Sequence, residues 1–265
     1  MMKQFFLFLI FNCLAFNFFG QNTTVSGTKN EKETAASHKV MLIPFETRLY
    51  MGEIDQNINA ETKLTAKEIK YKFRDGLNEQ LFKAFKTNKF NVVDLMEDTT
   101  KYKKDLDGIY QYLTYEFQKV PDQNNYQPPK KEKEQKKIEK GQLNVESNSD
   151  VRFMNAKITN AKVVPILYGK YKTDLFVFIN QLDIKASGNK GPAELGDGNG
   201  NRKITVHYTV YSYDAKEINS GIAEEEFAVN LNNPKKIIDK HFSKIATTIV
   251  ERVNKGLAPT TKKPN

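Results

Sequence analysis

Four carboxylates between positions 46 and 61 are the most concentrated set of residues that could do acid–base chemistry: Glu46, Glu53, Asp55 and Glu61. Two carboxyl groups in one site can act as general acid and general base when their surroundings push their pKa values apart. The loop that carries them follows an unbroken apolar run at 40–43. It therefore supports the hypothesis of a carboxylate-dependent hydrolase.

The same loop is more apolar than solubility requires, because Tyr50, Met51 and Ile54 lie among its acids. Apolar side chains grouped on a polar edge are typical of a surface that binds another protein. We therefore assign no catalytic residue and name five candidate partner-binding residues: Tyr50, Met51, Glu53, Ile54 and Asp55.

Other catalytic and metal-binding patterns are incomplete. Three histidines are spread along the chain: His38, His207 and His241. No two of them have the spacing of metal ligands, and the sequence contains no Gly-x-Ser-x-Gly elbow. The segment at 196–201 has the rhythm of a calcium loop, but Arg202 and Tyr208 occupy the positions where an EF-hand requires glycine and glutamate. We expect no metal and no cofactor.

Hydrophobic periodicity and turn signals predict the elements that must position these residues. A capping box, Thr65-Ala-Lys-Glu68, opens a helix with an apolar residue every four positions from Ile69 to Phe85. The expected strands are 40–43, 90–95, 173–185, 203–213 and 222–229. The expected helices are 65–88, a second from about 100 with Phe117 on its apolar face, a helix-like region at 151–171, and a last one from 234 to 256.

This order of elements predicts an α/β (α+β) fold, with a mixed sheet of about five strands and helices packed on it. A long polar insertion at 121–150 interrupts it, and its six lysines balance four glutamates and two aspartates. We interpret the insertion as solvated and partly disordered. The predicted organisation is a single domain at 38–257.

The two ends of the chain are expected to lie outside that domain. Residues 1–20 have a positive start, an apolar core of fifteen residues and a small residue, Gly20, before a polar stretch. This pattern indicates a signal peptide, since a spanning helix needs about 20 apolar residues. Residues 21–37 and 258–265 read as flexible segments. The one cysteine, Cys13, lies within the leader, which favours the bacterial periplasm.

Positive charge is concentrated along two of the predicted helices. Residues 63–104 hold eleven Lys or Arg against six acids, and residues 235–263 hold eight against two. An exported protein has little access to nucleic acid, so we expect acidic proteins or anionic membrane surfaces as targets. Ordinary solvated helix faces would also account for this pattern.

Several short patterns resemble a periplasmic α/β domain of bacterial envelope proteins. They are Ile43-Pro44-Phe45, Lys-Phe-Asn-Val-Val-Asp at 89–94, Tyr-Lys-Thr-Asp-Leu-Phe-Val-Phe at 171–178, and a hairpin turn at 214–221. This domain type occurs in the curli secretion channel, in lipoprotein activators of penicillin-binding proteins, and in the N-terminal part of TolB. The loop Tyr-Met-x-Glu-Ile-Asp at 50–55 also resembles exported Bacteroidota proteins. The resemblance implies a non-catalytic module that docks on partners.

The resulting hypothesis is a periplasmic or outer-membrane-associated adaptor that binds other envelope proteins. The loop at 46–59 and the basic helix faces are its expected contact surfaces. Two alternatives stay open at this point: the hydrolase acting through the acidic loop at 46–61, and a homo-oligomeric envelope scaffold.

Overall fold

The computed structural model describes residues 38–130, 138–139, 142–143, 151–186 and 201–257. The expected signal peptide at 1–20, the segments at 21–37 and 258–265, and the glycine-rich stretch at 196–200 lie outside the described residues, as do parts of the insertion. Within the described ranges, no helix is both long and apolar enough to cross a membrane.

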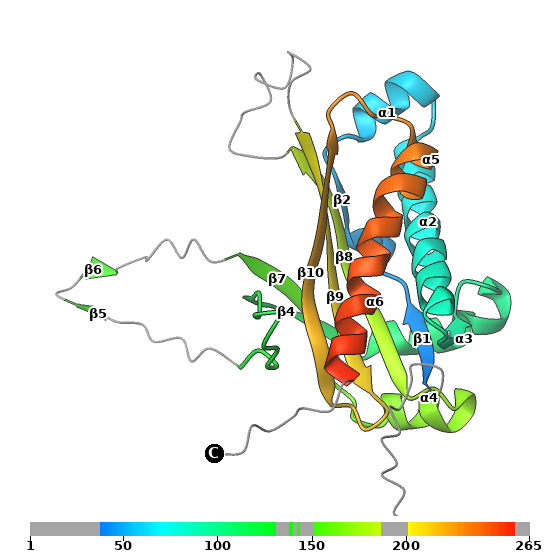
Figure 1. Cartoon of the computed structure of the whole chain (residues 1–265), viewed down its shortest axis with the longest axis vertical. Helices are drawn as coiled ribbons and strands as arrows, with labels where there is room; N and C mark the ends of the chain where they lie inside the picture. Colours follow the sequence, from blue (N-terminus) through cyan, green and yellow to red (C-terminus); the bar gives the residue numbers. More distant parts are fainter. Residues whose placement is uncertain (1–37, 131–137, 140–141, 144–150, 187–200, 258–265) are drawn as a thin grey trace, which may run out of the picture. The chain divides into compact units, whose positions relative to one another are not determined.

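A mixed six-stranded sheet forms the centre of the fold (Figure 1). Its main path runs in the order β10 (Glu217–Ala228), β9 (Asn201–Ser212), β8 (Leu175–Ala186), β1 (Lys39–Ile43) and β3 (Asn91–Asp94), and β2 (Tyr50–Gly52) pairs with β8. Strands β3, β1 and β8 pair in parallel. Strand β9 pairs antiparallel with β8, and β10 pairs antiparallel with β9. The predicted α/β class and mixed sheet are confirmed, with six strands where about five were expected.

The central strands are apolar on both sides because both faces of the sheet are covered. Along β8, Leu175 and Val177 enter one hydrophobic core, while Phe176 and Phe178 enter a second core on the opposite face. The unbroken apolar run of β1 divides between the two cores in the same way.

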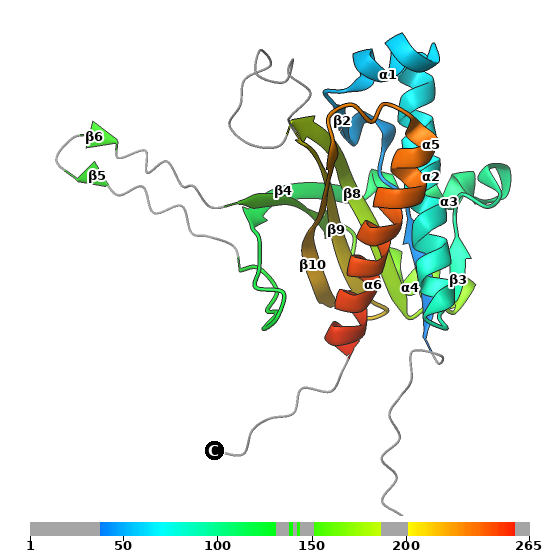
Figure 2. The same cartoon turned by 45° about the horizontal axis from the view of Figure 1, so that its top comes forward.

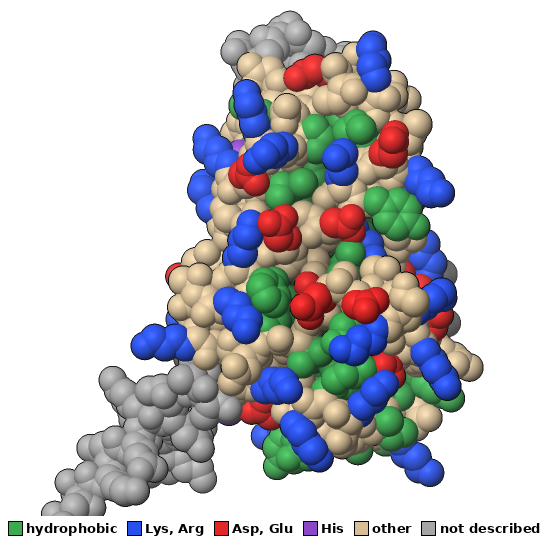
Figure 3. Space-filling model, turned by 90° about the vertical axis from the view of Figure 1, so that its right-hand side faces the viewer, with side chains coloured by type: hydrophobic (Ala, Val, Ile, Leu, Met, Phe, Trp, Pro, Cys, Tyr) green, Lys and Arg blue, Asp and Glu red, His purple; other side chains and the backbone are tan. Residues whose placement is uncertain are grey.

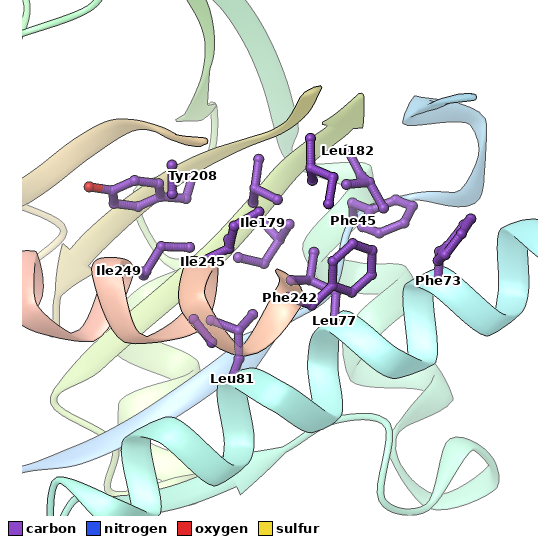
Figure 4. Packing of buried hydrophobic residues seen from close by; sticks show 14 of the residues in the cluster. Phe45, Phe73, Leu77, Leu81, Ile179, Leu182, Tyr208, Phe242, Ile245 and Ile249 are labelled. Atoms are coloured by element: carbon purple, nitrogen blue, oxygen red, sulfur yellow. The ribbon is translucent and has the colours of Figure 1, made fainter. Parts of the chain in front are cut away.

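Two long helices cover the first face and pack against each other (Figure 2). They are α2 (Ala66–Thr87) and α6 (Ser243–Leu257), the latter preceded by α5 (Pro234–Ile237) and a π-helical turn, η4 (Ile238–Phe242). The predicted capping box is present: Thr65 accepts from the Glu68 N–H, and the Glu68 carboxylate accepts from the Thr65 N–H. Figure 4 shows Phe73, Leu77 and Phe242 pointing from the helices toward the sheet, and all three belong to the core on this face.

The second face is covered by α3 (Thr99–Gln111), α4 (Val163–Tyr171) and an antiparallel pair, β4 (Leu113–Lys119) with β7 (Arg152–Ile158). The remaining elements are short: η2 (Thr47–Leu49), α1 (Asp55–Thr62), and the hairpin β5 (Ile138–Glu139) with β6 (Gln142–Leu143).

Two element predictions are wrong. The second helix ends at Gln111, and Phe117 lies in strand β4 with 59% of its surface exposed. The helix-like region at 151–171 is a strand followed by a short helix. Both errors have one cause, because β4 and β7 pair with each other across the insertion.

The start of the insertion also departs from the solvated segment that was expected. Gln123 donates to the carbonyl of Ser220 at 2.8 Å, and the Tyr126 hydroxyl donates to Glu217 at 2.9 Å. These contacts tie residues 121–126 to strand β10.

Side chains from the main sheet replace a neighbouring strand along the outer edge of β7. The Met154 N–H donates to His207, and the Met154 carbonyl accepts from Asn180. The Ala156 N–H donates to Thr209, and the Ala156 carbonyl accepts from Tyr211. Because buried backbone groups must be paired, this ladder explains why polar residues of β8 and β9 lie inside the protein.

Candidate functional site

Two adjoining hollows lie where strands β1 and β3 end, between helices α2 and α3. Their volumes are about 550 and 610 Å³, and Met96 and Thr99 line both. In open α/β sheets, ligands bind in the crevice outside the carboxyl ends of the parallel strands. We call these two hollows together the α2–α3 groove. Figure 3 views the molecule from the side on which α2 and α3 lie.

Arg74 and Tyr110 fix one wall of the groove to the end of β1. The Arg74 side chain donates from Nε to the Phe45 carbonyl at 2.8 Å and from Nη2 to the Tyr110 hydroxyl at 3.1 Å. That hydroxyl donates in turn to the Pro44 carbonyl at 2.5 Å. Burial raises the pKa of Tyr110 to about 12, so its proton stays in place at neutral pH.

Asn78 and Asp94 fix the other wall. Asn78 is 5% exposed and donates from Nδ2 to Oδ1 of Asp94 at 2.8 Å. The same carboxylate oxygen accepts from the Met96 N–H at 2.8 Å, which shapes the turn after β3. Helix α3 begins just beyond, where the Asp98 side chain accepts from the backbone N–H groups of Thr100 and Lys101.

The lining combines acids with apolar side chains. Six carboxylates line the groove: Glu46, Asp75, Glu79, Asp94, Glu97 and Asp107. Its basic side chains are Arg74 and Lys103, and apolar contacts come from Phe82, Met96 and Leu106. Figure 3 shows acidic and hydrophobic side chains interleaved in the middle of this face, with Lys and Arg among them and along its flanks. The side of α2 that lines the groove carries Asp75 and Glu79 beside Arg74, although the sequence of the helix is basic overall.

The structure places the five candidate partner-binding residues in different surroundings. Tyr50 and Ile54 are 7% and 3% exposed and belong to the core, so the expectation that they face a partner is wrong. Met51 is 50% exposed and Glu53 lies at the surface. Asp55 is half-buried and accepts from the Tyr50 hydroxyl at 2.6 Å. A binding role for Met51, Glu53 and Asp55 stays a prediction.

The carboxylates of the acidic loop have separate partners. Glu46 accepts two hydrogen bonds from Arg48, at 2.9 Å each, and one from Tyr115 at 3.3 Å. Asp55 is held by Tyr50, and burial raises the pKa of that carboxyl. Glu61 is exposed on α1. Of the predicted acids, Glu46 alone lines the α2–α3 groove as these two hollows define it.

The histidines serve the fold. His38 is 2.5 Å from Asp174 through Nδ1, His207 accepts from the β7 backbone, and His241 contacts Glu225 at 3.2 Å. In the part of the chain that the structure describes, no group of three His, Cys, Asp or Glu side chains could hold a metal ion.

Sequence reasoning missed Arg74, Asn78, Asp94 and Tyr110. The sequence signal for Asn78 is its place directly after Leu77, a position of the apolar stripe of α2. The structure shows that Asn78 is buried as well. The partners of Arg74 and Tyr110 are backbone carbonyls and each other, which no spacing in the sequence indicates.

No protein-family model matches the sequence, and no curated protein is significantly similar to it. The resemblance to periplasmic envelope domains therefore stays a prediction.

Proposed function

We propose that this chain is a non-catalytic adaptor of the bacterial envelope whose α2–α3 groove holds a basic amphipathic segment of a protein partner. The observation that carries the proposal is the lining of the groove, where six carboxylates surround apolar side chains. Glu46, Glu79 and Asp107 are paired with Arg48, Lys83 and Lys103, so Asp75, Asp94 and Glu97 supply most of the negative charge that a partner meets. The export part of the proposal rests on the leader pattern at 1–20.

The chemistry of the lining favours such a segment over a small substrate. Phe82, Met96 and Leu106 offer apolar surface, which supplies affinity when a partner covers it. Carboxylates around that surface attract Lys and Arg and reject acidic partners. A preference for a basic partner is unusual for this chain, because its formal net charge of +9 repels cations at long range.

The hydrolase receives less support from the same geometry. Acid–base catalysis by two carboxylates needs them in one site, whereas Glu46 and Asp55 are held by different neighbours. Glu46 is also neutralised by the guanidinium of Arg48.

Fluorescence anisotropy with two labelled helical peptides tests the proposal. One peptide combines Leu with Lys, and the other has Glu in place of each Lys. We expect the protein to bind the Lys peptide more tightly, against the sign of its net charge. The substitutions Glu79→Lys and Glu97→Lys together should weaken that binding at least about tenfold, which is about 1.4 kcal/mol.

A matched control carries the same change in net charge elsewhere. Glu61 on α1 and Glu251 on α6 are exposed and do not line the groove. The variant Glu61→Lys/Glu251→Lys should bind the Lys peptide nearly as the unchanged protein does. Equal losses in both variants, or a preference for the Glu peptide, would overturn the proposal.

A further inference from the structure

Helix α4 buries one side and leaves the other apolar and exposed. Val164 and Leu167 belong to the second core. Ile166 lies between these two residues in the sequence and is 63% exposed. Tyr168 follows Leu167 and is 40% exposed. A single exposed apolar residue is ordinary, but a group of them on one surface indicates a binding function.

A second element extends the same surface. Tyr213, in the turn between β9 and β10, is 52% exposed, and its ring centroid lies 5.1 Å from that of Tyr168. Two segments more than forty residues apart in sequence therefore contribute aromatic rings to one patch. We call Ile166, Tyr168 and Tyr213 the α4 patch.

Lysines are frequent in the two segments that form the α4 patch. Residues 159–173 contain Lys162, Lys170 and Lys172 and no acid. The ammonium of Lys172 lies 5.8 Å from the centre of the Tyr168 ring, and Lys216 lies just beyond the β9–β10 turn. At the lower end of Figure 3, where α4 lies, hydrophobic side chains alternate with Lys and Arg.

The acids near the patch already have partners. Asp105 accepts from Lys170 at 2.7 Å and from the Tyr171 hydroxyl at 2.5 Å. Asp214 accepts from the Ser212 hydroxyl at 2.5 Å. Lys170 balances Asp105, whereas Asp214 stays ionised because the Ser212 hydroxyl lowers its pKa. Lys162, Lys172 and Lys216 outnumber this one acid, so the charge near the patch is positive on balance.

We propose that the α4 patch docks this protein on an anionic lipid surface. Tyrosine rings concentrate at membrane interfaces, where the ring is sheltered and the hydroxyl stays hydrated. Lysine stems lie along apolar surface while their ammonium groups reach the headgroups, and each lysine near an anionic leaflet adds to binding. An acidic protein would match the lysines, but Ile166 and the two tyrosines favour a bilayer because they can enter its interface.

Vesicle flotation provides the first test. The probes are phosphatidylcholine vesicles with and without phosphatidylglycerol, and the protein starts at residue 21 so that the apolar leader does not contribute. This form retains the whole fold, because both hydrophobic cores are built from residues between Val40 and Leu257. We expect binding to the phosphatidylglycerol vesicles and its loss in the variant Ile166→Ser/Tyr213→Ser.

The matched control is Phe117→Ser/Val151→Ser, which removes two equally exposed apolar side chains from another surface, 59% and 61% exposed. This control should bind the vesicles as the unchanged protein does. If both variants bind alike, the attraction is an effect of net charge and the proposal fails. If the protein binds soluble polyglutamate through the α4 patch and ignores both vesicle types, the partner is an acidic protein and the proposal also fails.

Tryptophan fluorescence gives an independent readout, because the sequence contains no tryptophan. The substitution Ile166→Trp places a single reporter in the α4 patch, and Phe117→Trp places one outside it. We expect a blue shift on adding phosphatidylglycerol vesicles for Ile166→Trp alone. A shift for Phe117→Trp without one for Ile166→Trp would overturn the assignment of the surface. Neither test involves the α2–α3 groove.

Discussion

The backbone N–H of Met154 donates a hydrogen bond of 2.9 Å to Nδ1 of His207. Because Nδ1 accepts, the neutral ring carries its hydrogen on Nε2, which lies 3.8 Å from a carboxylate oxygen of Asp183. One buried imidazole therefore supports the edge of β7 and faces the acid of the neighbouring strand. The role of this histidine is therefore structural.

Replacing His207 by Leu should destabilise the fold by about 1–3 kcal/mol, because the buried Met154 N–H loses its acceptor. Urea unfolding followed by circular dichroism measures this change. The control is Thr205→Val, on the same strand but half-buried and bonded to exposed Glu224, which should stay within about 0.5 kcal/mol. Equal stability of the two variants would contradict the edge role.

Asp183→Asn should lower stability at neutral pH and leave it unchanged in acid. Burial by itself raises the pKa of Asp183, but interactions with His207, Lys185 and Gln181 outweigh it, so the pKa lies below its ordinary value of 3.8. A lowered pKa means that the ionised acid stabilises the folded state above pH 3.8, and this contribution disappears as pH falls through the lowered value. Thermal unfolding across this range is the measurement. A loss that persists in acid would point to packing instead.

Asp55→Asn should show the opposite pH dependence. Burial raises the pKa of Asp55 above 3.8, and the Tyr50 hydroxyl only partly offsets this. Stability therefore falls as pH rises from 3.8 to the raised value and stays lower above it, whereas below 3.8 both states are protonated. Asn can still accept from Tyr50, so we expect a higher melting temperature at pH 7 and none of that gain in acid. A lower melting temperature at pH 7 would refute the reasoning.

Two helical glycines should respond oppositely to alanine. A Cβ at Gly76 of α2 would lie 2.5–2.8 Å from three side-chain atoms of Ile238, while a Cβ at Gly108 of α3 meets nothing within 4 Å. Alanine is favoured over glycine in helices by about 1 kcal/mol, so Gly108→Ala should stabilise the fold by up to that amount. Gly76→Ala should lose this gain to the clash and destabilise it. Chemical unfolding of the pair decides between these outcomes.

Binding of the Lys peptide to the α2–α3 groove should weaken as salt increases, because exposed charge pairs are screened within about 8 Å at physiological ionic strength. Substituting Met96 by Ser should weaken binding without changing the salt dependence, since it removes apolar contact and no charge. Anisotropy titrations at several salt concentrations separate the two contributions. A salt-independent affinity would argue against the acidic lining.

Helix α2 could be predicted almost to the residue because its signals are local. The capping box fixes the start, the apolar residues every four positions fix the buried face, and Asn88 marks the end. Strand β8 could be predicted equally well, since its alternating side chains fill two cores. Neighbours in sequence supply everything that such elements require.

The segment at 113–117 could not be predicted because it satisfies two periods at once. Leu113 and Phe117 continue the helical spacing of α3, while Leu113, Tyr115 and Phe117 also alternate as a strand does. The choice depends on pairing with β7, which places Leu113 opposite Ile158. That partner lies beyond the insertion.

The sequence by itself determined the α/β class, the capped helix α2 and the buried central strands, because these follow from local spacing and composition. The tertiary structure decided which apolar loop residues are buried, since Tyr50 and Ile54 enter a core assembled from distant segments. It also brought Asn78 against Asp94 and Tyr168 against Tyr213. Surfaces such as the α2–α3 groove and the α4 patch arise from contacts between elements, and those contacts are fixed by how the layers pack on the sheet.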